Sequence, residues 1–420
     1  MKLLHTSDWH LGRATYQESR APDHDAVIAE IIDIARERRP DVILHTGDLF
    51  DQYLPGYVEI ERAAVALQQL AAIAPTVVVR GNHDSAALFR IFNRLLGGNG
   101  RLRFVDKPRH GDDGGVLRFP VDDDQVLRLA VLPFVHVSEV VDAFGPPESW
   151  GTAYNGRIRG YEAALADSLM QDFDPRRDIA MFAAHLHVGG AQLCSSERSL
   201  HVDETYATDL DALPPVSYAA FGHIHQPQRL PNTAITGRYA GSPLQLDFGE
   251  VNDRKGIVMV TVKAGEPAQI EKVLLRRGRR LRKFEGTLDE LRMQAADFTD
   301  EICLITIHSP APIPTLKEQV YDLLPRATIL PIANPADNQR SDTELARPDT
   351  VAPDTDLVEE FRQYIAEQGG VQNGAVDEVI RVFAALRQGV DEERDTVFPE
   401  EIALAQTLAP ATAGGASCDH

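Results

Sequence analysis

Short apolar runs that end abruptly in Gly, Asp, Asn or His recur along the first 262 residues. Runs rich in Val, Ile and Leu predict buried strands. The predicted strands are Lys2–Thr6, Asp41–Thr46, Thr76–Arg80, Arg128–Phe134, Ile179–Ala184, Ser217–Phe221, Ile235–Ala240 and Gly256–Val262. Apolar positions at helical spacing predict helices at Ala26–Arg38 and Tyr57–Ile73. The alternation predicts an α/β core, and the closely spaced later strands favour a mixed or two-sheet arrangement.

The pattern changes after residue 270. A small α/β domain is predicted at 271–333, with two helices and two strands at Leu288–Ala295, Ile302–His308, Thr315–Leu324 and Ala327–Pro331. Residues 334–356 have no apolar period and are typical of a solvated linker. Amphipathic patterns then predict helices at Leu357–Glu367, Val376–Gln388 and Glu400–Leu408. The small, polar residues 409–420 predict a disordered tail.

The composition is that of a globular protein, with 43% hydrophobic and 25% charged residues among 420. The N-terminus lacks the pattern of a secretory signal, and the longest uncharged stretch, Ile179–Ser196, is too polar to cross a bilayer. The three cysteines are widely separated and favour neither a disulfide framework nor a cysteine zinc site. We therefore expect a cytoplasmic protein with no membrane association.

The formal net charge of −21 argues against non-specific binding to nucleic acid, because phosphate contacts need Lys and Arg. The charge is unevenly distributed, since residues 334–400 contain 16 acidic and 6 basic residues, a net of −10. A basic run opens the small domain and consists of Arg276, Arg277, Arg279, Arg280, Arg282 and Lys283. The distribution is therefore compatible with a directed basic groove.

Side chains of metal-ligand types follow five of the predicted strands. They are Asp8 and His10, then Asp48 and Asp51, then Asn82, His83 and Asp84, then His185 and His187, and finally His223 and His225. Any one of these motifs alone has an ordinary explanation as a turn or a cap. Ligands in α/β folds gather beyond the carboxyl ends of strands, so five such ends in order favour one shared crevice.

We interpret the set as a two-metal site. Asp48 is a candidate bridge, with Asp8, His10 and a distant histidine around one ion, and Asn82 with two histidines around the other. Two cations about 3.5–4 Å apart can activate a water and hold a phosphoryl centre. Mixed carboxylate, amide and imidazole ligands suit Mn²⁺, Fe or Zn²⁺ better than Mg²⁺. We expect that five further histidines are not metal ligands, namely His24, His136, His187, His201 and His308.

The motifs resemble the signature of the calcineurin-like metallophosphoesterases. They are Asp8-x-His10, Gly47-Asp48-x-x-Asp51, Gly81-Asn82-His83-Asp84, His185 and Gly222-His223-x-His225. Within that superfamily, the chain resembles the SbcD family, the nuclease subunits of bacterial SbcCD complexes. The similar segments are KLLHTSDWHLG at 2–12, TGDLFD at 46–51 and YAGSPLQ at 239–245. The resemblance implies a two-sheet sandwich flanked by helices at 1–270, a capping domain at 271–333 and partner-binding helices at 357–408.

The resemblance also implies roles for single residues. Two divalent ions, with Mn²⁺ expected, would be held by Asp8, His10, Asp48 and His225, and by Asp48, Asn82, His185 and His223. His83 would be a catalytic histidine that is not a ligand, with Asp84 as an orienting carboxylate. Relatives often carry a histidine at the position of Asp51, so the resemblance assigns Asp51 no role.

The implied function is a DNA nuclease that acts in repair and recombination. It would be an exonuclease on double-stranded ends and an endonuclease on hairpin or single-stranded DNA, coupled to an SbcC-like SMC-type ATPase that binds the tail helices. The capping domain would help to choose the DNA substrate, which fits its basic run. The resemblance implies a homodimer within a heterotetramer. We expect the dimer contact at the apolar stripe Leu88, Phe89, Phe92, Leu95 and Leu96, with packing onto the chain's own sheet as the alternative.

Two other functions compete with this interpretation. A small-molecule phosphodiesterase or phosphoprotein phosphatase would use the same ligands. The linker and tail helices favour the nuclease subunit, because a stand-alone phosphatase does not need them. A non-catalytic adaptor is disfavoured because no ligand position has been lost.

Overall fold

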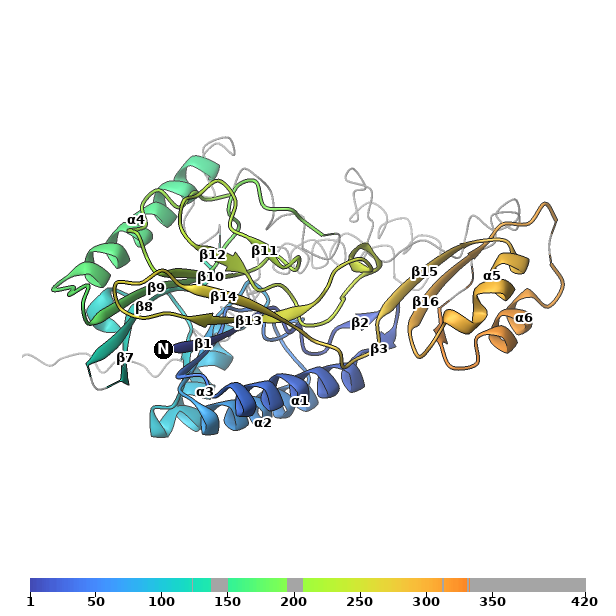
Figure 1. Cartoon of the computed structure of the whole chain (residues 1–420), viewed down its shortest axis with the longest axis horizontal. Helices are drawn as coiled ribbons and strands as arrows, with labels where there is room; N and C mark the ends of the chain where they lie inside the picture. The colour runs from blue at the N-terminus through green and yellow to red at the C-terminus, as the bar shows by residue number, and fades with distance from the viewer. Residues whose placement is uncertain (123, 137–149, 195–206, 312, 331, 333–420) are drawn as a thin grey trace, which may run out of the picture. The chain divides into compact units, whose positions relative to one another are not determined.

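The N-terminal strand enters the middle of a six-stranded sheet. The computed structural model describes residues 1–122, 124–136, 150–194, 207–311, 313–330 and 332 (Figure 1). The first sheet has the order β14-β13-β1-β4-β5-β6. Its strands are β1 (Lys2–Thr6), β4 (Val42–His45), β5 (Thr76–Val79), β6 (Leu102–Val105), β13 (Gly256–Thr261) and β14 (Gln269–Leu274). Strands β1, β4, β5 and β6 are parallel, so their carboxyl ends lie at one edge of the sheet.

A second six-stranded sheet has the order β11-β12-β10-β9-β8-β7. Its strands are β7 (Val116–Asp122), β8 (Gln125–Leu132), β9 (Asp178–His185), β10 (Tyr218–Gly222), β11 (Gln228–Arg229) and β12 (Gly237–Tyr239). Strands β8, β9, β10 and β12 run parallel to one another. Two buried sheets explain why most of these strands read as continuous apolar runs in the sequence.

Alternate residues of each strand enter different cores. In β5, Val77 and Val79 join the apolar cluster between the two sheets, where they pack with residues such as Leu129. Val78 faces the opposite way and joins the cluster beneath the helices. The two-residue period of a strand produces this division. The predicted two-sheet sandwich is thus confirmed.

Helices cover the outer face of each sheet (Figure 1). Helices α1 (Ala21–Arg38), α2 (Tyr57–Ile73) and α3 (Ala86–Leu96) share a buried cluster with the first sheet. Helix α4 (Trp150–Met170) shares one with the second sheet. A short hairpin, β2 (Ala14–Thr15) and β3 (Glu18–Ser19), precedes α1. None of the helices in the described ranges is long and apolar enough to span a bilayer.

A three-stranded parallel sheet with two helices follows. Its elements are β15 (Leu281–Gly286), α5 (Leu288–Gln294), β16 (Ile302–Ile307), α6 (Leu316–Leu323) and β17 (Thr328–Ile329). This part has a buried cluster of its own that includes Phe284, Ile305 and Val320. Thr287 and Glu290 form a capping box at the start of α5, which fixes where that helix begins.

Three arginines of the basic run, which lies before and within β15, contact other groups of the chain. Arg279 donates to both carboxylate oxygens of Asp23 and pairs with Glu18 at 3.1 Å. Arg277 pairs with Asp33 at 2.8 Å. The Arg282 guanidinium lies 3.6 Å from the centroid of the Phe298 ring. Arg276, Arg280 and Lys283 are exposed and have no ion pair among the described residues. A directed basic groove stays a prediction.

The apolar stripe on α3 also differs from the expectation. Phe89 and Phe92 are buried and lie against Phe104, with ring centroids 5.3 and 5.1 Å away. Packing onto the chain's own sheet, the alternative, is correct for these two residues. Leu95 is 75% exposed, so only part of the stripe is open to another chain.

The predicted linker, tail helices and disordered tail (334–420), together with His201, lie outside the described residues. The predicted boundary at 270/271 falls within β14, which extends from Gln269 to Leu274 and pairs with β13 of the first sheet. The division into a core and a capping domain stays a prediction.

Candidate metal centre

The loops after β1 and β4 run side by side and place three acidic or imidazole side chains together. The main-chain nitrogens of Asp8 and His10 donate to the carbonyl oxygens of Gly47 and Asp48, at 2.9 and 3.1 Å. Asp8, His10 and Asp48 all have left-handed backbones, with φ of 52°, 47° and 52°. Such a conformation costs about 1–2 kcal/mol for a residue other than glycine. Strain of this kind persists only where the surroundings enforce it, and it is concentrated at functional sites.

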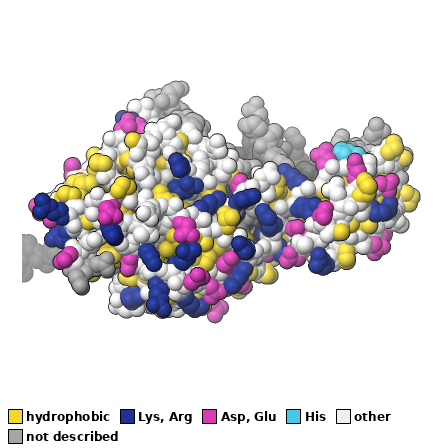
Figure 2. Space-filling view, viewed as in Figure 1, with side chains coloured by type: hydrophobic (Ala, Val, Ile, Leu, Met, Phe, Trp, Pro, Cys, Tyr) yellow, Lys and Arg dark blue, Asp and Glu magenta, His cyan; other side chains and the backbone are white. Residues whose placement is uncertain are grey.

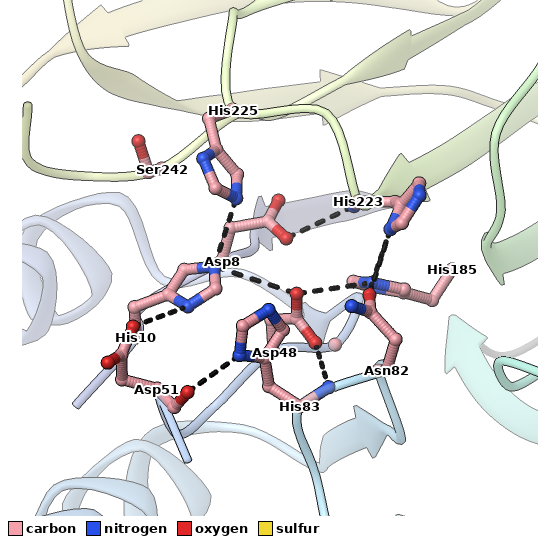
Figure 3. A network of polar contacts seen from close by, with 12 residues as sticks. Asp8, His10, Asp48, Asp51, Asn82, His83, His185, His223, His225 and Ser242 are labelled. Atoms are coloured by element: carbon pink, nitrogen blue, oxygen red, sulfur yellow. Dashed lines mark hydrogen bonds and ion pairs between the residues drawn. The ribbon is translucent and has the colours of Figure 1, made fainter. Parts of the chain in front are cut away.

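One group of side chains meets where β1, β4 and β10 end (Figure 3). His10 Nε2 lies 3.0 Å from His225 Nε2 and 3.5 Å from Asp48 Oδ2. Asp8 completes the group, in which one potential ligand atom from each residue lies within 4.8 Å of the others. All four side chains are buried.

A second group meets around the amide of Asn82. Its Oδ1 atom lies 2.8 Å from His185 Nε2 and 2.9 Å from His223 Nδ1, and these two nitrogens are 3.2 Å apart. His185 Nε2 is also 3.4 Å from Asp48 Oδ2. The same carboxylate oxygen therefore faces both groups.

The two groups fit divalent cations. Asp8 Oδ1 accepts the main-chain N–H of His223 at 3.1 Å, whereas its buried Oδ2 has no hydrogen-bond partner in the described part of the chain. Nitrogens of two histidines face each other at 3.0–3.2 Å in both groups, an arrangement that needs a shared proton or a cation between them. Nitrogen and oxygen donors together suit borderline transition metals.

Glycines leave the space that the site occupies. A Cβ at Gly81 would lie 2.1 Å from Asp48 Oδ1, and one at Gly47 would lie 2.2 Å from His185 Nδ1. A Cβ at Gly222 would lie 2.2 Å from the carbonyl oxygen of Thr46, which is in contact with His185 Nδ1. Any side chain at these positions would push a candidate ligand or its support out of place.

The electrostatics of the site demand positive charge. Burial raises the pKa of Asp8, and the charges of His185 and His225 only partly offset it. Burial would also raise the pKa of Asp48, but the positive His185 and His83 hold it well below its usual range. Burial alone would lower the pKa of His185, but the attraction of Asp48 raises it to about 9. Buried carboxylates so close together need protons or cations as counter-charges.

His83 lies beside the first group. Its ring centroid is 4.8 Å from that of His10, and its Nδ1 is 2.6 Å from the carbonyl oxygen of Asp51. Since a carbonyl only accepts, Nδ1 carries the proton. Asp84 instead binds the main chain, accepting from the nitrogens of Gly81 at 2.9 Å, Phe50 at 3.1 Å and Leu49 at 3.2 Å. Asp84 therefore ties together the two loops that carry Asp48 and His83.

Several other residues complete the surroundings. Asp51 Oδ1 lies 3.4 Å from His10 Nδ1, which gives Asp51 a contact that the sequence analysis did not assign. His187 is buried, with its ring centroid 6.5 Å from that of His223, and belongs to neither group. Three histidines expected outside the ligand set belong to neither group: His24 is buried in α1, His136 packs on Phe134, and His308 pairs with Glu285.

Sequence reasoning missed Glu250. It is buried in a 3₁₀ turn, Phe248–Glu250, and its Oε1 lies 3.6 Å from His225 Nδ1. The stretch around it, LQLDFGE at 244–250, contains a second acidic residue, Asp247, so the residue type alone does not single out Glu250. No motif spacing in the sequence connects Glu250 to His225.

Comparison with known proteins identifies the family of the chain. The family model described as calcineurin-like phosphoesterase matches residues 1–227, and the chain belongs to this family. Among individual proteins, the chain is similar to the SbcD subunit of the nuclease SbcCD from Bacillus subtilis (strain 168), with 27% identity over 410 residues that cover 94% of this chain and 99% of that protein.

Two further relatives are SbcD subunits of the same nuclease. That of Escherichia coli (strain K12) is 27% identical over 322 residues, covering 71% of this chain and 74% of that protein. That of Staphylococcus epidermidis (strain ATCC 12228 / FDA PCI 1200) is 26% identical over 295 residues, covering 69% of this chain and 74% of that protein.

Proposed function

We propose that the chain is a metal-dependent DNA nuclease, the SbcD-like subunit of an SbcCD-type complex. The observation that carries the proposal is the position of Asp48 Oδ2, which faces two groups of candidate ligands in a chain similar over almost its whole length to the SbcD subunit of a nuclease SbcCD. Its substrates are double-stranded ends for exonuclease action and hairpin or single-stranded DNA for endonuclease action. The phosphodiesterase or phosphatase alternative has less support, because the relatives that match along most of the chain are nuclease subunits.

The ligand sets follow the two groups. Asp8, His10, Asp48 and His225 hold one ion, and Asp48, Asn82, His185 and His223 hold the other. We assign Mn²⁺ to both sites. The chemistry that a bound pair of divalent cations supplies is Lewis-acid polarisation of the phosphodiester and activation of a water molecule.

The chain's own residues supply proton transfer and order. The bond from His83 Nδ1 to the Asp51 carbonyl directs Nε2 away from the loop, where it can donate a proton to the leaving oxygen or stabilise charge in the transition state. His83 is buried but is 7% exposed, more than any of the candidate ligands. Asp84 keeps His83 in register with Asp48 by holding both loops.

The remaining assignments concern DNA and partners. Residues 271–333 form a capping domain, and Arg276, Arg280 and Lys283 are its side chains available for the DNA backbone. On the face in Figure 2, Lys and Arg side chains gather near the centre with acidic side chains among them. Helices at 357–408, reached by a linker at 334–356, bind an SbcC-like ATPase. The chain acts as a homodimer within a heterotetramer in the cytoplasm, associated with the nucleoid.

Digestion of linear duplex and hairpin DNA with added Mn²⁺, with and without the SbcC-like ATPase, tests the activity. We expect metal-dependent cleavage that the ATPase extends to long duplexes. A phosphopeptide and p-nitrophenyl phosphate serve as competing substrates. Turnover of these with no cleavage of DNA under either condition would favour the phosphatase alternative instead.

Deletion of Asp356–His420 tests the partner assignment separately. Cleavage of small phosphodiester substrates with Mn²⁺ should be retained, because the candidate ligands all lie before residue 226. Co-purification with the ATPase should be lost. A truncated chain that captures its partner with unchanged affinity would show that the tail is not the docking segment.

A further inference from the structure

Three of the histidines at the site have one ring nitrogen facing the candidate ligands and the other close to an oxygen atom of a neighbouring group. His185 Nδ1 lies 2.8 Å from the carbonyl oxygen of Thr46. His10 Nδ1 lies 3.4 Å from Asp51 Oδ1, and His225 Nδ1 lies 3.6 Å from Glu250 Oε1. A partner at the outer nitrogen fixes both the tautomer and the ring orientation of a metal-binding histidine.

We propose that Glu250, together with Lys255, is a positioning residue that orients His225 and so completes one of the two ion sites but not the other. The inference rests on the proposed function and adds a residue to it. Glu250 lies 25 positions after His225 in the chain, outside every motif of the ligand set. The contact therefore exists only in the folded protein.

The pair holds His225 at two points. Glu250 Oε2 is 2.7 Å from Lys255 Nζ, and both side chains are buried. Lys255 Nζ in turn donates to the carbonyl oxygen of His225 at 2.9 Å. The carboxylate thus faces the imidazole at 3.6 Å, while the ammonium donates to the backbone of the same residue.

A buried ion pair is a poor means of stabilising a fold, since desolvation of both charges offsets much of their attraction. The turn that carries Glu250 also has other support. Gln245 Nε2 donates to the carbonyl oxygens of Glu250 and Val251 at 3.0 and 2.9 Å, and Gln245 Oε1 accepts the N–H of Leu281 at 2.8 Å. Glu250 Oε2 also accepts the main-chain N–H of Leu246 at 3.1 Å, so the bonds from Gln245 anchor the main chain of the turn in addition to the Glu250 carboxylate.

Glu250 should affect only one of the two ion sites. His225 belongs to the group with Asp8, His10 and Asp48, whereas Asn82, His185 and His223 contact one another without it. Misorientation of His225 should weaken the first site and leave the second intact. Loss of an outer partner of a metal-binding histidine typically weakens metal binding about 10–100-fold.

The test is a titration of the full-length protein with Mn²⁺. Calorimetry measures the binding of the ions, and electron paramagnetic resonance shows whether the bound ions are coupled. The wild type should bind two ions that give the spectrum of a coupled pair. Glu250→Ala should retain one tight ion, bind the other about 10–100-fold more weakly, and give the six-line spectrum of an isolated Mn²⁺ at one equivalent. Glu250→Gln, whose amide oxygen can still accept from His225, should bind the ion of the first site more tightly than Glu250→Ala does.

Asp178→Asn is the matched control. It breaks another buried ion pair, in which Asp178 Oδ2 lies 2.5 Å from Arg128 Nη2, at the far end of β9 from His185. That variant should lose thermal stability and still bind two coupled ions. A purely structural role for Glu250 predicts that Glu250→Ala does the same.

Two outcomes distinguish a failure of this inference from a failure of the proposed two-metal function. Binding of two coupled ions by Glu250→Ala with wild-type affinity would overturn the positioning role, and absence of a second ion in the wild type would overturn the two-metal function itself. If Glu250→Ala does not fold, the double variant Glu250→Leu/Lys255→Met replaces the pair by apolar side chains, a change that is often tolerated. Unweakened binding of both ions by that variant would equally overturn the inference.

Discussion

The Oδ1 atom of Asp48 accepts a hydrogen bond from the main-chain nitrogen of His83 at 2.9 Å. With Oδ1 held in this way, Oδ2 is the oxygen that faces His10 Nε2 at 3.5 Å and His185 Nε2 at 3.4 Å. The backbone of one loop therefore orients the carboxylate that joins the two groups of the site. Replacement of Asp48 and replacement of His83 should consequently have different effects, since only Asp48 presents a ligand atom to both groups.

Asp48→Ala should lose both ions and all hydrolysis, because it removes the oxygen common to the two sites. Metal content of the purified, folded variant, measured by mass spectrometry after dialysis, checks this. Glu61→Ala, at an exposed position on α2, is the control and should keep two ions. Two tightly bound ions in folded Asp48→Ala would remove the bridging assignment.

His83→Gln should bind metal and DNA normally and lose most turnover. The main-chain bond to Asp48 does not depend on the side chain of His83, so the site keeps its shape. A general acid contributes typically 10²–10⁴-fold to a rate, and a loss in that range is expected. Single-turnover cleavage at saturating Mn²⁺ is the measurement, and a near-normal rate would exclude His83 as the proton donor.

Gly81→Ala should damage the site from a position that is not a ligand. Its Cβ would lie 2.1 Å from Asp48 Oδ1 and 2.2 Å from the Asp48 main-chain nitrogen, and a main chain held on both sides cannot move away cheaply. Overpacking of this kind costs about 1–3 kcal/mol of unfolding free energy. We expect a lower melting temperature and weaker Mn²⁺ binding. Gly98→Ala, where a Cβ meets nothing within 4 Å, should change neither, and equal behaviour of the two variants would contradict the argument.

The strands could be predicted from sequence where both of their faces are buried. β1 lies at the predicted residues, and β4 and β9 lie within one residue of them at each end. The pattern does not predict β14, because its sequence, QIEKVL, is charged and largely exposed. An apolar run is the signal of a doubly covered strand, and an edge strand does not need one.

The candidate ligands could be predicted because parallel strands bring their carboxyl ends to one edge. Glu250 and Asp51 could not be assigned in this way, since their contacts with His225 and His10 depend on how loops fold back. The stripe on α3 shows a related limit. The spacing identifies an apolar face, but it does not tell whether the chain's own sheet or another chain covers Phe92.

A homodimer that uses α3 should depend on its exposed residues. Ile91 is 48% and Leu95 is 75% exposed, whereas Phe92 packs against Phe50 and Phe104. Ile91→Asp/Leu95→Asp should therefore yield a folded monomer in light scattering, with an unchanged circular dichroism spectrum. Phe92→Asp should unfold the chain because it buries a charge. A dimer that persists in the double variant would place the contact elsewhere.

The last prediction concerns the pH dependence of stability and the buried Glu162 of α4. Neither carboxylate oxygen of Glu162 has a hydrogen-bond partner within the described residues, and burial raises its pKa to about 8, with Asp211 adding to the rise and Arg159 opposing it. The unfolded chain loses this proton near pH 4.5, whereas the folded chain keeps it up to about pH 8. Between those values the folded state binds more protons, so its stability falls as pH rises.

The stabilising contribution of Glu162 is thus fully present below pH 4.5 and is lost as pH rises through about 8. The expected slope is roughly 1 kcal/mol per pH unit. Glu162→Gln cannot ionise, so urea denaturation between pH 5 and pH 8 should give a flatter profile than the wild type. Asp167→Asn, at an exposed position on the same helix, should keep the wild-type slope. Equal slopes for Glu162→Gln and the wild type would show that Glu162 already ionises in the folded protein well below pH 8.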